Sequence, residues 1–180
     1  MSIVDRVKNI LMTPKTEWPT IAGEATTTQA LYTGYIMILA AIGPVTLLLR
    51  SDIIGAITAY IIALAAPFIM ALIVDALAPT FGGEKNFMQS LKLTAYSYTA
   101  AWIAGILNLL GSVGGLLGLI AAIYTVYTFY LGVPVMKKCP QEKAVAYTLV
   151  VVAIVVVCSF VVAALLGSML MSPIIGGWQR

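Results

Sequence analysis

The sequence contains few charged residues and no histidine. Only 9% of its 180 residues are Asp, Glu, Lys or Arg, while 61% are hydrophobic. A soluble domain carries about 25% charged residues, so this composition indicates a protein embedded in lipid rather than an ordinary soluble domain. The absence of histidine removes the commonest metal ligand and the commonest general base.

Cysteine is also scarce, because only Cys139 and Cys158 are present, and two cysteines do not indicate a disulfide framework. The apolar segments contain no paired carboxylates, although acid–base or metal catalysis needs convergent ionisable groups. Gly114-Gly115 is not followed by the Lys-Ser or Lys-Thr of a phosphate-binding loop. The basic residues are scattered rather than gathered into a nucleic-acid-binding face. We therefore expect no enzyme activity, no cofactor, no metal and no nucleic-acid partner.

One long uncharged stretch, residues 93–136, organises the chain. It is about twice the roughly 20 residues that cross a bilayer as a helix, and its middle reads Gly-Ser-Val-Gly-Gly. The pattern predicts two antiparallel transmembrane helices joined by a tight hairpin. Gly111 with Gly115, and Gly114 with Gly118, have the spacing of small residues that let helix backbones approach closely. A hinge or a dimer contact is the alternative role for these glycines.

The remaining apolar stretches complete an all-α integral membrane protein with five transmembrane helices. The expected spans are approximately 30–49, 53–74, 93–110, 113–134 and 144–166. Gly43-Pro44 is expected to kink the first span, and Gly167 to end the fifth. We expect residues 1–24 to form an N-terminal amphipathic cytosolic segment and residues 25–180 to form the five-helix transmembrane domain.

The N-terminal segment begins with an amphipathic helix from residue 2 to residue 12, because apolar and charged residues alternate at helical spacing. It lacks the continuous apolar run of a signal peptide. Ser2 and Asp5 are expected to form a capping pair. Such a helix either lies on an anionic membrane surface or packs on the inner face of the protein itself. Both arrangements remain open at this point.

Two proline-containing dipeptides follow this helix. Thr13-Pro14 is expected to end it, and Trp18-Pro19 marks a second stop. Trp18 and Trp178 are expected to anchor the chain at the membrane interface.

The distribution of basic residues predicts the orientation. With the N-terminus in the cytosol, the outer segments contain only Arg50 and Arg180. The inner segments then contain the other eight, which are Arg6, Lys8, Lys15, Lys85, Lys92, Lys137, Lys138 and Lys143. Because positive residues concentrate on the cytoplasmic side, we expect a multi-pass protein of the cell inner (cytoplasmic) membrane with its C-terminus outside.

Asp75 is the most informative acidic residue, since it lies at the inner end of the second span, where an unpaired carboxylate facing lipid would be costly. Lys92, Lys137 or Lys138 is expected to pair with it. Asp75 either caps the helix end or contacts an ion or a lipid headgroup.

Tyrosines recur every third residue near the inner end of the fourth span, at Tyr124, Tyr127 and Tyr130, and they indicate either a buried polar seam or a ligand path. The candidate ligand-binding or lipid-binding residues are Asp75, Asn108, Tyr124, Tyr127, Tyr130, Lys137 and Lys138. The candidate structural residues are Gly111, Gly114, Gly115, Gly118 and Pro134.

Two stretches resemble the Yip family of Ypt/Rab-interacting membrane proteins, in its short prokaryotic form. These are Arg-Val-Lys-Asn-Ile-Leu from Arg6, followed by Pro14 and Trp18, and Tyr-Thr-Phe-Tyr-Leu-Gly-Val-Pro from Tyr127 to Pro134. The resemblance implies a five-helix membrane protein with a cytosolic N-terminus. Eukaryotic members are associated with Rab GTPases, vesicle traffic and membrane shaping, and carry an Asp-Leu-Tyr-Gly-Pro element that these 180 residues lack. The resemblance therefore does not extend Rab binding to this chain.

Two functional hypotheses follow. The first is a non-enzymatic scaffold or adaptor in the lipid bilayer that recruits an anionic lipid or a protein partner at its cytosolic face. The alternative is a small transporter or lipid-handling protein with a cytosol-open cavity lined by Asp75, Asn108 and the three tyrosines of the fourth span.

Overall fold

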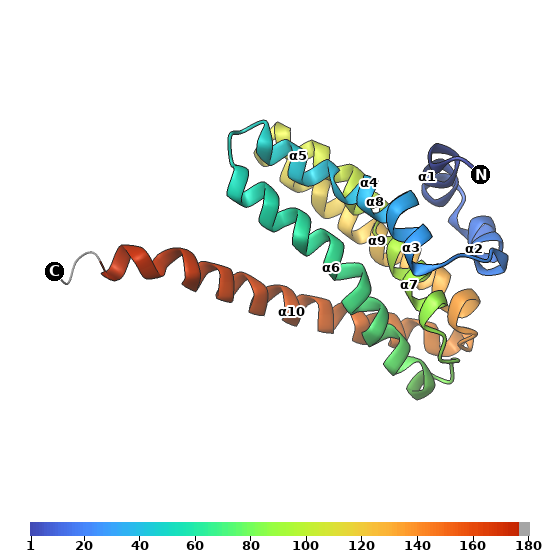
Figure 1. Cartoon of the computed structure of the whole chain (residues 1–180). Helices are drawn as coiled ribbons and strands as arrows, with labels where there is room; N and C mark the ends of the chain where they lie inside the picture. Colours follow the sequence, from blue (N-terminus) through green and yellow to red (C-terminus); the bar gives the residue numbers. More distant parts are fainter. Residues whose placement is uncertain (177–180) are drawn as a thin grey trace. The chain divides into compact units, whose positions relative to one another are not determined.

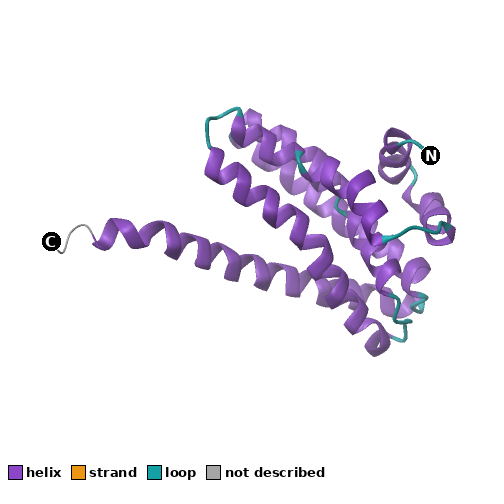
Figure 2. Cartoon of the chain, in the orientation of Figure 1, coloured by secondary structure: helices purple, strands orange, loops and turns teal. Residues whose placement is uncertain are grey.

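The computed structural model describes residues 1–176, with side chains described through residue 164. These residues form helices joined by turns, and no strand occurs among them (Figure 2). The chain divides into two compact units, Met1–Thr148 and Leu149–Arg180, and the last helix, α10 (Gln141–Gly176), runs through the boundary. The all-α fold expected from the sequence is confirmed.

Two short helices, α1 (Ile3–Met12) and α2 (Pro14–Gly23), open the first unit (Figure 1). The Asp5 amide donates to Ser2 Oγ over 3.1 Å, so the predicted cap is present. The Thr13-Pro14 boundary is also confirmed, because α1 ends at Met12. The predicted stop at Trp18-Pro19 is wrong, since α2 continues through Pro19. Pro19 removes one backbone hydrogen bond, while the burial of Trp18 beside it keeps this turn of the helix packed.

The first membrane segment is a broken helix. It comprises α3 (Thr28–Leu31), the π-helix η1 (Tyr32–Ile36), α4 (Met37–Ala40) and α5 (Ile42–Leu48). The axis bends by 40° between Ala40 and Ile42. The kink expected at Gly43-Pro44 therefore falls slightly earlier, because Pro44 has no N–H for the carbonyl of Ala40.

Three longer segments follow in the first unit. The second is α6 (Ile53–Leu77), which a 3₁₀ turn, η2 (Ala78–Phe81), extends. The third comprises α7 (Phe87–Ser97), α8 (Thr99–Ala104) and the 3₁₀ helix η3 (Gly105–Leu110). It begins before the expected residue 93 because the Asn86 side chain caps it, accepting from the Gln89 amide over 3.1 Å. The fourth is α9 (Ser112–Lys137), which begins directly after the predicted turn at Gly111.

Within the described residues, four helices are long and apolar enough to cross a membrane, and the bent first segment makes a fifth if it counts as one span. Their outer surfaces carry large apolar side chains. Ile54 is 77% exposed and Ile120 is 62% exposed, for example. Such surfaces would be unfavourable in water, so lipid is the solvent that these helices fit.

The fifth helix continues beyond the expected end. α10 runs through Gly167 to Gly176, so the predicted end at Gly167 is wrong. A glycine inside a helix costs only about 1 kcal/mol, and transmembrane helices contain glycine frequently. Trp178 and Arg180 lie outside the described residues.

Candidate binding site at the charged end

One end of the first unit gathers most of the basic residues. Lys92 Nζ, on α7, donates to the carbonyl of Ile21 over 2.8 Å, and the Glu84 amide donates to the carbonyl of Lys137 over 2.8 Å. These contacts join α7 to α2 and the turn before α7 to the end of α9, and the ion pair between Arg6 and Glu17 adds α1. We call this region the charged end. It carries the basic residues Arg6, Lys8, Lys15, Lys85, Lys92, Lys137, Lys138 and Lys143.

A buried group of side chains, which we call the Arg6 cluster, attaches α1 to the rest of the unit. The cluster consists of Arg6, Glu17, Glu24, Lys92 and Tyr96. Arg6 is only 5% exposed, and its guanidinium pairs with both Glu17 and Glu24 and lies 5.5 Å from the centre of the Tyr96 ring. Lys92 is 3% exposed and donates to the carbonyls of Ile21 and Glu24. Of the two arrangements left open for α1, the structure has the helix packed on the protein.

The charge on Arg6 is retained in this setting. Burial alone would lower the pKa of the guanidinium, but its hydrogen bond to Glu24 and the nearby carboxylates raise that pKa above its ordinary value. Arg6 therefore forms a charged, directional link from α1 to both ends of α2.

Trp18 fixes α2 to α9, and its predicted role as an interface anchor is wrong. The indole is fully buried, and its Nε1 donates to the carbonyl of Thr128 over 3.1 Å. A Cβ placed on Gly132 would lie only 2.7 Å from Trp18 Cε2. Gly132 therefore leaves a notch in α9 that the indole fills, and this is why the ring lies inside the protein rather than at the lipid interface.

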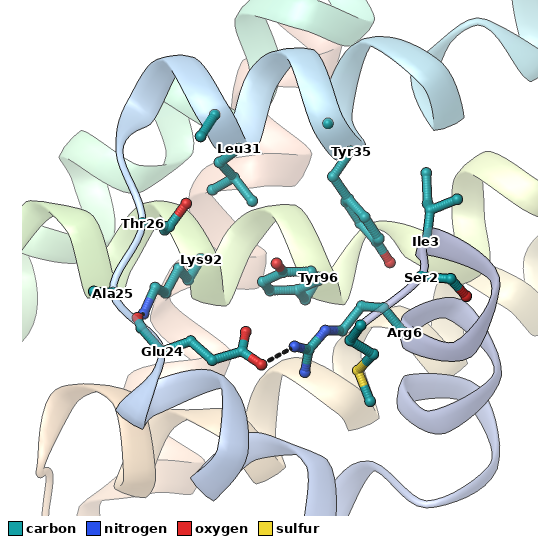
Figure 3. A pocket seen from close by; sticks show the side chains of 13 residues that line it. Ser2, Ile3, Arg6, Glu24, Ala25, Thr26, Leu31, Tyr35, Lys92 and Tyr96 are labelled. Atoms are coloured by element: carbon teal, nitrogen blue, oxygen red, sulfur yellow. Dashed lines mark hydrogen bonds and ion pairs between the residues drawn. The ribbon is translucent and has the colours of Figure 1, made fainter.

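A cavity of about 330 Å³ opens beside the Arg6 cluster (Figure 3). It lies between α1, the segment that follows α2, the first membrane segment and α7. The residues that shape it are Ser2, Arg6, Glu24, Gly34, Tyr35, Lys92 and Tyr96. The Tyr35 hydroxyl is hydrogen-bonded to Thr99 Oγ1 over 2.7 Å, whereas the Tyr96 hydroxyl has no hydrogen-bond partner among the described residues. Gly34 lies in the π-helix, and a Cβ there would meet nothing within 4 Å.

A second group, the Asp75 cluster, joins α6, α7 and α9. It consists of Asp75, Asn86, Ser90 and Lys137. Lys137 Nζ donates to Asp75 Oδ1 over 2.7 Å, to Ser90 Oγ over 2.7 Å and to the Asn86 carbonyl over 3.2 Å. Asp75 Oδ1 also accepts from the Asn86 amide over 2.7 Å and from Ser90 Oγ over 3.0 Å. All three N–H groups of the fully buried ammonium are therefore used within the protein.

The Yip1 domain model matches residues 8–175, which is nearly the whole chain. The chain belongs to the Yip family. The family resemblance seen in the sequence is therefore confirmed, and this Yip protein is a membrane protein. No curated protein and no solved structure shows significant similarity to it.

The structure of this Yip protein separates the residues predicted to form one binding site. Asp75 and Lys137 pair, but Lys138 pairs instead with Glu84 on the surface over 2.8 Å. The Asn108 carbonyl accepts from Arg50 over 2.5 Å, at the end of the helices opposite the charged end.

The three tyrosines of the fourth span also have separate environments. The Tyr124 hydroxyl donates to the carbonyl of Leu11 over 2.6 Å, which ties α9 to the end of α1. The Tyr130 hydroxyl accepts from Gln141 Nε2 over 3.2 Å, and Tyr127 is exposed. The described residues do not form the single cavity that was expected around Asp75, Asn108 and these tyrosines.

The candidate structural residues occupy different settings in and beside α9. Gly111 precedes the helix with φ +62°, and a Cβ on Gly114 would collide with the carbonyl of Leu107 in η3. A Cβ on Gly115 or Gly118 would meet nothing within 4 Å. Pro134 lies inside the last turns of α9. The close approach between the two helices of the hairpin therefore occurs at Gly114.

Sequence reasoning missed Arg6, Glu24, Tyr35 and Tyr96 as site residues. One signal was present, because Glu17 and Glu24 are acidic residues in a short segment that follows a helix with a basic side chain. Glu17 lies in the first turn of α2 and Glu24 directly after its end, and two such carboxylates beside Arg6 could have indicated an ion pair inside the protein.

Proposed function

We propose that this Yip protein is a non-enzymatic membrane scaffold that recruits a partner at its charged end. The supporting observation is the division of charges at this end. Arg6, Lys92 and Lys137 are buried and hold helices together. By contrast, Lys8, Lys15, Lys85 and Lys143 are exposed, and no carboxylate within the described side chains pairs with them. The buried charges serve the fold, and the exposed ones are available to a partner.

We propose an acidic protein surface as the partner of these lysines. Exposed lysines attract a negatively charged surface over about 8 Å at physiological ionic strength, and salt screens that attraction. We further propose that the charged end faces the cytosol, since it collects eight of the ten basic residues. An anionic lipid surface is the other candidate from the sequence, and it would compete for the same lysines.

We prefer the scaffold to a transporter with Asp75 in its path, because the Asp75 carboxylate already accepts hydrogen bonds from Lys137, Asn86 and Ser90. A transported ion would have to displace those donors. If Asp75→Asn abolished solute flux in proteoliposomes, the transporter would become the better explanation.

The recruitment test uses the full chain in its native membrane. Two double variants, Lys8→Gln/Lys15→Gln and Lys85→Gln/Lys143→Gln, remove the exposed charges, and Arg50→Gln removes one charge at the opposite end. Chemical crosslinking in cells, followed by mass spectrometry, should show protein crosslinks that decrease in either lysine variant and persist in the control. Crosslinks that survive in both lysine variants, or that vanish equally in Arg50→Gln, would contradict recruitment by the charged end.

Orientation is tested separately with single thiols. In a Cys139→Ser/Cys158→Ser background, a cysteine placed beside Ser2 should react with a membrane-impermeant reagent only after the cells are opened. Labelling in intact cells would place the charged end outside the cytosol and would reject the cytosolic scaffold.

A further inference from the structure

The cavity beside the Arg6 cluster takes no part in the proposed recruitment, which uses the outward-facing lysines. Figure 3 shows Arg6, Lys92, Glu24 and Tyr96 gathered around one space. Its volume of about 330 Å³ is within the usual range for small-molecule sites. The volume suits a headgroup rather than a single ion.

The polar lining includes donors that the described residues leave unused. Of the five N–H donors of an Arg side chain, Glu17 and Glu24 engage two on Arg6, and two carbonyls engage two of the three donors of Lys92. The Tyr96 hydroxyl adds a further donor without a partner among the described residues. A ligand rich in acceptors would satisfy these groups.

The cations of the lining favour the oxygen atoms of an anion. Arg6 and Lys92 are positive and Glu24 is negative, while Glu17 lies outside the lining and pairs with Arg6, so these four charges sum to zero. A phosphodiester has several acceptor oxygens, and it matches the unused donors of Arg6, Lys92 and Tyr96.

The cavity also adjoins a surface that faces lipid. Ala30 and Gly34 line it from the first membrane segment, and both are exposed. The same segment continues with Met37 and Ile38, which are 40% and 53% exposed. Apolar chains leaving the cavity along this side would stay in the bilayer, while the phosphate stayed with the Arg6 cluster.

We propose that the cavity binds the phosphate of a phospholipid headgroup, with Lys92, Arg6 and Tyr96 as donors and the acyl chains along Ala30, Gly34 and Ile38. The π-helix contributes by placing Gly34, which has no side chain, at the wall of the cavity, and π-helical turns are frequent at functional sites. The site is independent of the scaffold proposal, because none of the four exposed lysines lines it.

The first experiment compares ligands on the full chain purified in mild detergent. Calorimetric titration with dioctanoyl phosphatidylglycerol should show binding at least tenfold tighter than with dioctanoylglycerol, which has the same chains and no phosphate. Equal affinity for the two would overturn the proposal. Glycerol 3-phosphate binding as tightly as the phospholipid would keep the phosphate site but overturn its assignment to a lipid.

The second experiment tests the residues. Tyr96→Phe removes only the free hydroxyl and should weaken phosphatidylglycerol binding about tenfold, as expected for one hydrogen bond to a charged acceptor. Tyr127→Phe, at an exposed tyrosine outside the cavity, should bind like the parent chain. Gly34→Leu should fill the space and abolish binding. Unchanged affinity in Tyr96→Phe overturns the site, and this variant decides the question even if Gly34→Leu does not fold.

Discussion

Removal of the Lys137 ammonium should destabilise the protein far more than removal of the neighbouring Lys138 ammonium. Lys137 is completely buried and makes three hydrogen bonds, one of them to Asp75. Breaking a buried ion pair from one side costs about 3–5 kcal/mol, because the remaining charge has lost its partner. Lys138 pairs with Glu84, but their side chains are 71% and 64% exposed. Such a surface pair contributes about 0–1 kcal/mol.

Lys137→Met should lower the free energy of unfolding by about 3 kcal/mol, which is the lower limit for breaking a buried ion pair from one side. The Asp75 carboxylate would keep the Asn86 amide and the Ser90 hydroxyl as donors, and its side chain is 20% exposed, so water reaches it in part. Replacing both partners, in Asp75→Leu/Lys137→Met, should recover most of the loss, because an apolar pair leaves no unpaired charge behind.

The assay is reversible unfolding in mixed detergent micelles, followed by tryptophan fluorescence. Trp18 and Trp102 are buried in the first unit and report loss of its packing. Lys137→Met and Lys138→Met remove the same charge from adjacent positions, so the difference between them isolates the effect of burial. If both variants unfolded within about 1 kcal/mol of the parent chain, the assignment of the Asp75 cluster as a structural link would be refuted.

Three other predictions concern the N-terminal helices and the hairpin. Trp18→Ala should cost about 3–5 kcal/mol and should speed hydrogen exchange throughout α2, since it empties the notch in α9. Gly114→Leu should lower the yield of folded protein, because its Cβ collides with a backbone carbonyl, whereas Gly118→Leu, which faces open space, should not. The hydrogen bond with Ser2 lowers the pKa of Asp5, so its contribution to α1 is present above the ordinary carboxyl pKa and is lost as the pH falls through the lowered value. The protection of the α1 amides, measured relative to their intrinsic exchange rates at each pH, should therefore fall in acid, and Ser2→Ala should remove that fall.

The membrane segments could be predicted from the sequence because length and apolar composition almost determine them. The hairpin at Gly111 and the limit of α9 at Lys137 follow from a long uncharged stretch with one helix breaker at its centre. The breaks inside segments were harder to locate. The π-helix at Tyr32–Ile36 has no distinctive residue pattern, and the cavity beside it was therefore not predictable.

The choice of ion-pair partners could not be made from the sequence either. Three lysines were available to Asp75, and local backbone geometry decides between two of them. Lys137 ends α9 facing α6 and α7, while Lys138 adopts a left-handed conformation with φ +51°, which turns the chain away from the helix. Lys92 points instead to the end of α2. The spacing of these lysines in the sequence does not specify the direction in which each side chain points.

A basic side chain on an amphipathic helix can bind either lipid phosphates or carboxylates of the same chain. Arg6 combines the two roles in the arrangement proposed here. Its carboxylate partners dock α1, and its guanidinium also lines the cavity, so the cavity has this shape only while α1 is docked. Lys8 lies on the same helix and is exposed. A partner that holds Lys8 and prefers α1 undocked would therefore lower the affinity of the cavity for its lipid. By linkage, the lipid would lower the affinity for that partner by the same factor. A partner that binds α1 in its docked position would leave lipid affinity unchanged or raise it, so the sign of the coupling reveals which state of α1 the partner selects.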